Sequence, residues 1–162
     1  MQLYEFYFKT ISGTQLPMDR FRGRAVLLFN SATESQYARQ LSKLQRLWEN
    51  YRNFGLAVIA LPCNDFGERE PGDETEIARR CEEEFGVHFP LTTKQSLRGR
   101  FLCPAFRALK EAHGRDIMPR GNFFKYLFDT QGQLRCVWPN RIEPNDPVIK
   151  TRIEKELKAW IL

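Results

Sequence analysis

Two uniformly apolar runs, separated by one amphipathic segment, constrain the fold of this chain more than any other feature of its sequence. The runs cover 25–29 and 56–61, and such runs are typical of sheet strands covered on both faces. Between them, apolar residues recur at spacings of three or four, as on one face of a helix: Tyr37, Leu41, Leu44, Trp48 and Tyr51. The pattern predicts two parallel neighbouring strands joined by a right-handed helical crossover, with Gly55 ending the helix.

The start of this helix is predicted from a capping pattern. Thr33 can cap the helix, and Gln36, three residues later, completes a capping box. Ser35 is therefore expected in the first helical turn, where unpaired backbone N–H groups and the helix dipole create a partial positive charge.

The remaining elements complete a single α/β domain over residues 1–162. Residues 3–8 predict a strand that turns back at 11–14 to form an N-terminal β-hairpin. Further helices are predicted over about 74–85, from Pro104 to Ala112, and from about Pro147 to the end of the chain. Strands over 122–128 and 134–138 should pair antiparallel, because only the short turn at 129–132 joins them. The order of elements is that of a thioredoxin-like fold: a central mixed β-sheet flanked by helices.

The chain carries a net charge of +5, and its charges are unevenly distributed. From Lys94 to Lys125 there are eight Lys or Arg residues and only two carboxylates, whereas 65–85 holds nine carboxylates and three arginines. The simpler interpretation is that both stretches are solvated surface. The functional interpretation is a basic lip that attracts an anionic small molecule or an acidic protein partner. No aromatic-interleaved basic repeat is present, so nucleic acid is not expected as a partner.

Hydropathy and cysteine spacing exclude several classes of protein. No apolar run approaches the roughly 20 residues that span a bilayer, and the N-terminus does not read as a signal peptide, so we expect a cytoplasmic protein without stable membrane insertion. The four cysteines, at 63, 81, 103 and 136, form no Cys-x-x-Cys pair. With only His88 and His113 as histidines, no metal site is expected, and the cysteines are interpreted as free thiols.

Five segments, spread over nearly the whole chain, are too specific for a generic α/β domain. Residues 61–67 read Leu-Pro-Cys-Asn-Asp-Phe-Gly and are followed by Glu-Pro-Gly at 70–72. This resembles the P-C-N-Q-F-G-x-Q-E-P-G signature of the glutathione peroxidase family. Segments 4–6, 26–35, 85–90 and 121–129 resemble, in the same order, that family's Y-D-F opening, its V-L-L-I-V-N-V-A-S-K-C strand and turn, its F-x-x-x-F-P segment and its W-N-F-T-K-F-L-V-D strand.

The resemblance implies a thioredoxin fold and the reduction of hydrogen peroxide or organic hydroperoxides by a catalytic tetrad. The tetrad consists of a peroxidatic Cys or selenocysteine, a Gln, a Trp and an Asn. Carried over residue by residue, the nucleophile falls on Ser35, the Gln on Asp65, the Trp on Gly121 and the Asn on Asn122. Only Asn122 matches the family pattern.

These departures remove the chemistry that the resemblance implies. A serine hydroxyl stays protonated at neutral pH, and oxygen cannot pass through the sulfenic acid that stores the oxidising equivalent. Asp65 can only accept hydrogen bonds when ionised and would raise the pKa of a nearby thiol. Gly121 removes an indole donor and is expected to leave space in its place. Together with Gln36, where the family has Gly, they indicate a diverged site rather than a single Cys-to-Ser change.

A serine hydrolase is a further reading of Ser35 and Asp65, and the sequence argues against it. Serine needs a base, usually His, and neither histidine falls in a segment that the implied fold brings to residue 35.

Two hypotheses remain open from the sequence. In the first, the chain keeps the fold as a binding or regulatory module, with glutathione or a thioredoxin-like protein as a partner at the basic 94–125 surface. In the second, it is an active thiol peroxidase in which Cys63 or Cys81 replaces the lost nucleophile. Cys81 falls where many non-vertebrate members of the family that this chain resembles carry the resolving cysteine. No cofactor is implied, and glutathione or thioredoxin would serve as reductant only in the second case. The short 103–120 stretch resembles that of monomeric family members.

Overall fold

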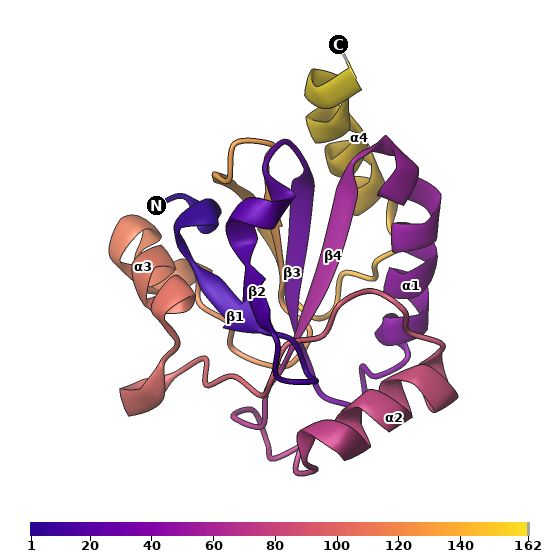
Figure 1. The fold of residues 1–162 in the computed structure, drawn as a ribbon, viewed down its shortest axis with the longest axis vertical. Coiled ribbons are helices and arrows are strands. Elements are labelled where there is room, and N and C mark those ends of the chain that lie inside the picture. The colour runs from indigo at the N-terminus through magenta and orange to yellow at the C-terminus, as the bar shows by residue number, and fades with distance from the viewer. Residues whose placement is uncertain (162) are drawn as a thin grey trace.

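A four-stranded mixed sheet forms the centre of the molecule. The computed structural model describes residues 1–161, with side-chain surroundings up to Leu157; residue 162, which the predicted last helix included, lies outside the described residues. The strands are β3 (Ala25–Ser31), β4 (Leu56–Pro62), β5 (Lys125–Phe128) and β6 (Leu134–Trp138), in the spatial order β4-β3-β5-β6. Figure 1 shows β3 and β4 side by side in the middle of the fold.

The parallel pair β3 and β4 confirms the prediction from the two apolar runs. Their register runs from Ala25 opposite Leu56 to Ser31 opposite Pro62, and all residues of both strands are buried. β5 pairs antiparallel with β3 and with β6, which makes the sheet mixed, as predicted. Because the parallel strands β3 and β4 end at the same edge of the sheet, the segments that follow them begin next to each other, at Ala32 and Cys63.

Helices cover both faces of the sheet and create two cores. The helices are α1 (Gln40–Tyr51), α2 (Glu74–Phe85), α3 (Pro104–His113) and α4 (Pro147–Ile161). Leu27 of β3 belongs to the core formed with α1, α2 and α4, whereas the adjacent Leu28 belongs to the core formed with α3. This alternation follows from the two-residue period of a strand. Figure 1 shows α3 on the opposite side of the sheet from α1.

The N-terminal segment differs from its prediction in part. The hairpin exists, formed by β1 (Tyr7–Lys9) and β2 (Gln15–Pro17), but Leu3–Glu5 is a 3₁₀ turn rather than the first half of a strand. Leu3 is fully buried, and its N–H donates to the carbonyl of Gly132 at 2.9 Å. Burial of the apolar side chain and this tertiary hydrogen bond override the local strand pattern.

The predicted start of α1 is wrong. The helix begins at Gln40, and 32–39 forms successive turns in which the N–H of Ser35 donates to Ala32 (3.2 Å) and that of Ala38 donates to Ser35 (3.2 Å). Thr33 caps no helix, because its hydroxyl donates to the carboxylate of Glu70 instead. The end of the helical segment matches the prediction: Gly55 adopts a left-handed conformation with φ of 106°.

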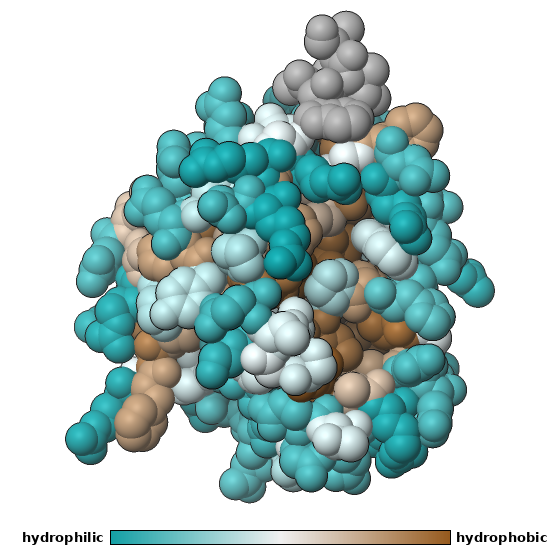
Figure 2. Space-filling view, in the orientation of Figure 1, coloured by the Kyte–Doolittle hydropathy of each residue, from teal (hydrophilic) through white to brown (hydrophobic). Residues whose placement is uncertain are grey.

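Polar residues dominate the face shown in Figure 2, and hydrophobic residues show between them in a recess beside helices α1 and α2 and on the side of the molecule where α3 lies. None of the helices in the described part of the chain has the length and apolarity needed to cross a membrane.

Candidate functional site

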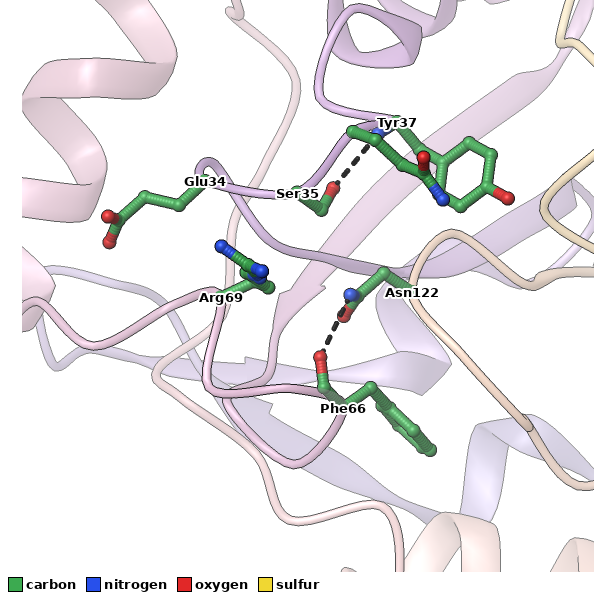
Figure 3. A pocket seen from close by; sticks show the side chains of 7 residues that line it. Glu34, Ser35, Tyr37, Phe66, Arg69 and Asn122 are labelled. Atoms are coloured by element: carbon green, nitrogen blue, oxygen red, sulfur yellow. Dashed lines mark hydrogen bonds between the residues drawn. The ribbon is translucent and has the colours of Figure 1, made fainter.

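A pocket of about 540 Å³ opens where β3 and β4 end. Its walls come from three segments: the turn at 34–37 after β3, Phe66 and Arg69 from the loop after β4, and Asn122 before β5. Figure 3 shows Ser35, Arg69 and Asn122 around the same space. The structure therefore brings together two of the four residues carried over from the family pattern, Ser35 and Asn122.

Ser35 occupies the turn as a hydrogen-bond acceptor. Its Oγ accepts from the backbone N–H of Tyr37 at 3.2 Å, and its side chain is part-buried at the pocket wall. Since α1 begins only at Gln40, Ser35 does not lie in the first turn of that helix, where the dipole acts most strongly. The hydroxyl has no histidine partner: His88 and His113 are exposed, and neither lines the pocket. Among the residues that line the pocket, no histidine is present to activate Ser35 for hydrolysis.

A buried carboxylate fixes the turn against the loop after β4. Glu70 is only 1% exposed, and it accepts hydrogen bonds from the N–H of Thr33 (2.9 Å) and from the Thr33 hydroxyl. The N–H of Glu34 donates to the Arg69 carbonyl at 3.0 Å, which adds a second link. Burial raises the pKa of Glu70, and the two hydrogen bonds from Thr33 oppose this shift. The geometry of the pocket therefore depends on a polar contact between residues 37 positions apart.

Replacing Thr33 with valine should destabilise the fold by about 1–3 kcal/mol, because the Glu70 carboxylate loses a buried hydrogen-bond donor. Urea unfolding at neutral pH measures the change. Thr75→Val, at an exposed position of α2, is the matched control and should change the free energy of unfolding by less than about 0.5 kcal/mol. Equal effects of the two substitutions would show that the Thr33–Glu70 contact contributes nothing.

Asn122 is held at the pocket by unusual backbone geometry. It is 9% exposed, and its Nδ2 donates to the Phe66 carbonyl at 3.0 Å. Its Oδ1 is buried without a partner among the described residues. The following residue, Phe123, adopts a positive φ of 63°, a conformation that costs energy for a bulky side chain. Such strain persists only where the surrounding contacts enforce it.

Asn30 on β3 supplies those contacts. Its Nδ2 donates to the Gly121 carbonyl and its Oδ1 accepts from the Phe124 N–H, both at 2.9 Å. Its backbone carbonyl also accepts from the N–H of Phe123 at 2.8 Å. The buried Asn30 side chain therefore forms hydrogen bonds with the backbone on both sides of Phe123, and it fixes the position of Asn122.

Asp65 and Gly121 lie outside the pocket wall. The Asp65 carboxylate accepts from the Leu97 N–H (2.7 Å) and the Ser96 hydroxyl (3.2 Å), so it is bound to the loop before α3. The expectation that Gly121 leaves open space is wrong. A Cβ atom there would lie 2.9 Å from Nδ2 of Asn140, because the Asn140 side chain fills that position.

The cysteines are distributed over the fold without forming a dithiol. Cys63, Cys81 and Cys103 are buried, and Cys136 is partly exposed. Burial is the main reason that the pKa of Cys63 is raised to about 12, and the negative charge of Asp65 acts in the same direction. Burial likewise raises the pKa of Cys81 to about 12, with Glu70 contributing. Neither thiol lines the pocket of Ser35.

The basic stretch from Lys94 to Lys125 is only partly a surface. All of its arginines are exposed, but Lys125 is fully buried on β5, and its Nζ donates to the Ile142 carbonyl at 2.6 Å. Nζ also lies 3.4 Å and 3.5 Å from the carbonyl oxygens of Pro139 and Asn140. Burial lowers the pKa of Lys125 to about 7, and the charge of Glu143 opposes the shift. Lys125 therefore cannot belong to a basic lip.

Comparison with known proteins identifies the family. The glutathione peroxidase family model matches residues 3–110. The chain belongs to the glutathione peroxidase family. Its relatives include the glutathione peroxidase-like peroxiredoxin GPX5 of Chlamydomonas reinhardtii, 33% identical over 98% of each chain. The glutathione peroxidase homolog BsaA of Staphylococcus aureus is 35% identical, again over 98% of each chain.

Solved structures show the same fold. A crystal structure of T. cruzi GPX1 superposes with a TM-score of 0.77 at 21% identity, covering 98% of this chain and 97% of that one. A thiol:disulfide interchange protein of the thioredoxin family from Chlorobium tepidum gives a TM-score of 0.69 at 15% identity, covering 94% and 92%. The predicted thioredoxin-like fold is thereby confirmed.

Several pocket residues were missed by the sequence reasoning, and the family motif contained a signal for some of them. Arg69 stands where the glutathione peroxidase signature has its second Gln, and Glu34 stands where the active-site turn has Lys. Both are changes of charge beside Ser35 that the motif comparison could have revealed. Tyr37 and Phe66 give no such signal, because an aromatic residue at either position also fits a packing role.

Proposed function

We propose that this chain retains the glutathione peroxidase fold but has lost thiol peroxidase chemistry, and that it acts as a binding or regulatory protein through the pocket beside Ser35. One observation carries the proposal: the pocket wall holds a serine at the position that the family pattern gives to the nucleophile, and no cysteine lines it. A hydroxyl cannot form the sulfenic acid on which the peroxidase cycle depends.

The surroundings of Ser35 support a loss that extends beyond one residue. Asp65, at the Gln position, is bound to Ser96 and Leu97 and does not line the pocket. At the Trp position, Asn140 fills the space beside Gly121. A cysteine placed at residue 35 would therefore lack two of the hydrogen-bond donors that the family pattern supplies.

What the pocket retains suits recognition. Ser35 and Asn122 place polar side chains at the pocket wall, and Arg69 offers an exposed guanidinium for an anion. Tyr37 and Phe66 add aromatic surface at the wall. Pockets of this kind, with a few polar groups on an aromatic wall, are typical of small-molecule sites.

For the partner, we propose glutathione or a thioredoxin-like protein bound at the basic surface of 94–120, where Arg98, Arg100 and Arg107 are exposed. Calorimetric titration of the chain with each, compared with the Arg98→Gln/Arg100→Gln variant, tests this surface.

We further propose a monomeric, cytoplasmic protein. Light scattering in solution and cell fractionation test these two points.

A second candidate function is an active thiol peroxidase that uses Cys63 or Cys81. The names of the relatives favour it, since one is described as a peroxiredoxin. The burial of both thiols and their raised pKa values argue against it, because the thiolate is the form that attacks peroxide.

An NADPH-coupled assay with hydrogen peroxide, using either glutathione or thioredoxin with its reductase, separates the two functions. The unmodified chain should show no turnover above buffer, and Ser35→Cys should show only weak turnover. The decisive comparison is the Cys63→Ser/Cys81→Ser variant, with Cys136→Ser as its control. Turnover by the unmodified chain that the double variant loses, and the control keeps, would refute the binding role in favour of the second candidate.

A further inference from the structure

A second concavity, separate from the pocket of Ser35, lies between α1 and the start of α4. Its volume is about 210 Å³. Lys43, Arg46 and Asn50 line it from α1, and Asn145 and Lys150 line it from the other side. The α1 residues are spaced by three and four, so they share one face of the helix. In Figure 1, α1 and α4 lie on the same side of the sheet.

The polar lining of this concavity is cationic. Three of its side chains are Lys or Arg, two are amides, and none is a carboxylate. One of these cations, Lys43, forms an ion pair: its Nζ lies 3.5 Å from Oε2 of Glu143. Asp146 does not line the concavity, and its Oδ1 accepts from the Val148 N–H at 2.8 Å at the start of α4. In the described part of the chain, Arg46 and Lys150 form no ion pair.

The stability of the helices does not explain this arrangement. Like charges three residues apart on a helix, as in Lys43 and Arg46, repel by a few tenths of a kcal/mol. Lys150 lies in the first turn of α4, where the helix dipole disfavours a cation. The apolar anchor of this part of α1 is Leu47, which is 2% exposed, so the cations are not needed for packing.

We propose that this concavity binds the phosphate group of a small phosphorylated ligand. Arg46 and Lys150, which form no ion pair with the described residues, supply two positive charges that match a phosphate dianion. Lys43, paired with Glu143, and the amides of Asn50 and Asn145 add hydrogen-bond donors for its oxygens. The volume is smaller than that of typical pockets for drug-sized ligands, which begin near 300 Å³, so it fits a phosphate with a short organic group. The phosphate can belong to a free metabolite or to a lipid headgroup.

Titration of the ¹⁵N-labelled full-length chain with inorganic phosphate at pH 7.5, with ionic strength held constant by sodium chloride, tests the site by NMR. Saturable shifts are expected at the amides of Lys43, Arg46, Asn50, Asn145 and Lys150. The variants Arg46→Gln and Lys150→Gln should each raise the dissociation constant about threefold to fivefold, and their combination about tenfold or more. Lys110→Gln, an exposed cation on α3 across the sheet, is the matched control and should leave binding unchanged.

A second arm identifies the source of the phosphate. Sedimentation with phosphatidylcholine vesicles containing phosphatidic acid is compared with vesicles of phosphatidylcholine alone. Saturable binding to either probe that the Arg46→Gln/Lys150→Gln variant loses supports the site, and the probe that binds more tightly identifies the source. Shifts that stay linear with phosphate, together with vesicle binding that is absent or equal in all variants, would overturn the proposal. Neither result depends on the pocket of Ser35.

Discussion

Replacing Asn30 with alanine should lower the free energy of unfolding by about 3 kcal/mol and displace Asn122 from its pocket. The substitution removes the donor to Gly121 and the acceptor for the Phe124 N–H, both at 2.9 Å. The Gly121 carbonyl and the Phe124 N–H are then left unpaired, and each unpaired buried group costs about 1–3 kcal/mol of stability. Without these hydrogen bonds on either side of it, Phe123 can relax from its positive φ to a more favourable backbone conformation.

Urea unfolding measures the stability of this variant, and the side-chain amide resonances of Asn122 report on the pocket. Asn53→Ala is the matched control, since Asn53 is exposed in the turn after α1. It should change stability by less than about 0.5 kcal/mol. If Asn30→Ala lost no more than the control, or if the Asn122 amide signals stayed in place, Asn30 would not be the residue that positions Asn122.

The second large effect concerns the buried Lys125. Its pKa is lowered to about 7 in the folded chain, against 10.5 as the ordinary value. Between these values the unfolded chain binds the proton and the folded chain releases it, so stability should rise with pH across this window. For one proton the slope approaches about 1.4 kcal/mol per pH unit, or about 5 kcal/mol over the whole window. Below pH 7 both states are protonated and Lys125 contributes no slope.

Urea unfolding of the unmodified chain and of Lys125→Met, from pH 6 to pH 8.5, isolates this contribution. The difference in stability between the two proteins should stay constant below about pH 7 and then grow in favour of the unmodified chain. The range stops at pH 8.5 because cysteines in the unfolded chain ionise above it. Their ionisation would lower stability as the pH rises and so oppose the effect of Lys125. Lys110→Met, at an exposed position, should follow the unmodified chain at every pH. A constant difference up to pH 8.5 would show that buried Lys125 keeps its proton throughout.

The framework of the fold could be read from local patterns, because its elements depend on residues close in sequence. The runs at 25–29 and 56–61 carry enough apolar surface to require burial on both faces, so the parallel pair β3 and β4 followed. Helix α2 was predicted with the observed bounds, and its N-cap, Asp73, accepts from the Glu76 N–H as local capping requires.

The errors arise where a distant residue decides the local structure. Thr33 has the sequence context of a helix cap, but Glu70, on the loop after β4, takes its hydroxyl. Gly121 lacks a side chain, yet Asn140 fills the space. Lys125 belongs to a basic run by sequence, but its place on β5 directs it to carbonyls beyond β6. Each outcome depends on the packing of loops, which a local pattern does not contain.

The same limit applies to the candidate site. The family motif located Ser35 and Asn122, which do share a pocket, and it gave the family from a few segments. The motif could not show that the Asp65 carboxylate accepts hydrogen bonds from Ser96 and Leu97. These partners lie 31 and 32 positions further along the chain, in the loop before α3. The serine at residue 35 was visible in the sequence, whereas the contacts made by the residues around it required the structure.

The central claim, that this pocket no longer performs thiol peroxidase chemistry, is tested most directly without any reductant. The fully reduced chain is mixed with a few equivalents of hydrogen peroxide, and peroxide loss is followed over seconds while intact mass is recorded. Every peroxidatic thiol consumes one equivalent of peroxide in its first turnover, whatever reductant follows. The expected result is a peroxide concentration equal to that of buffer and an unchanged protein mass. Rapid consumption of one equivalent, with one added oxygen mapped to Cys63 or Cys81, would contradict the claim.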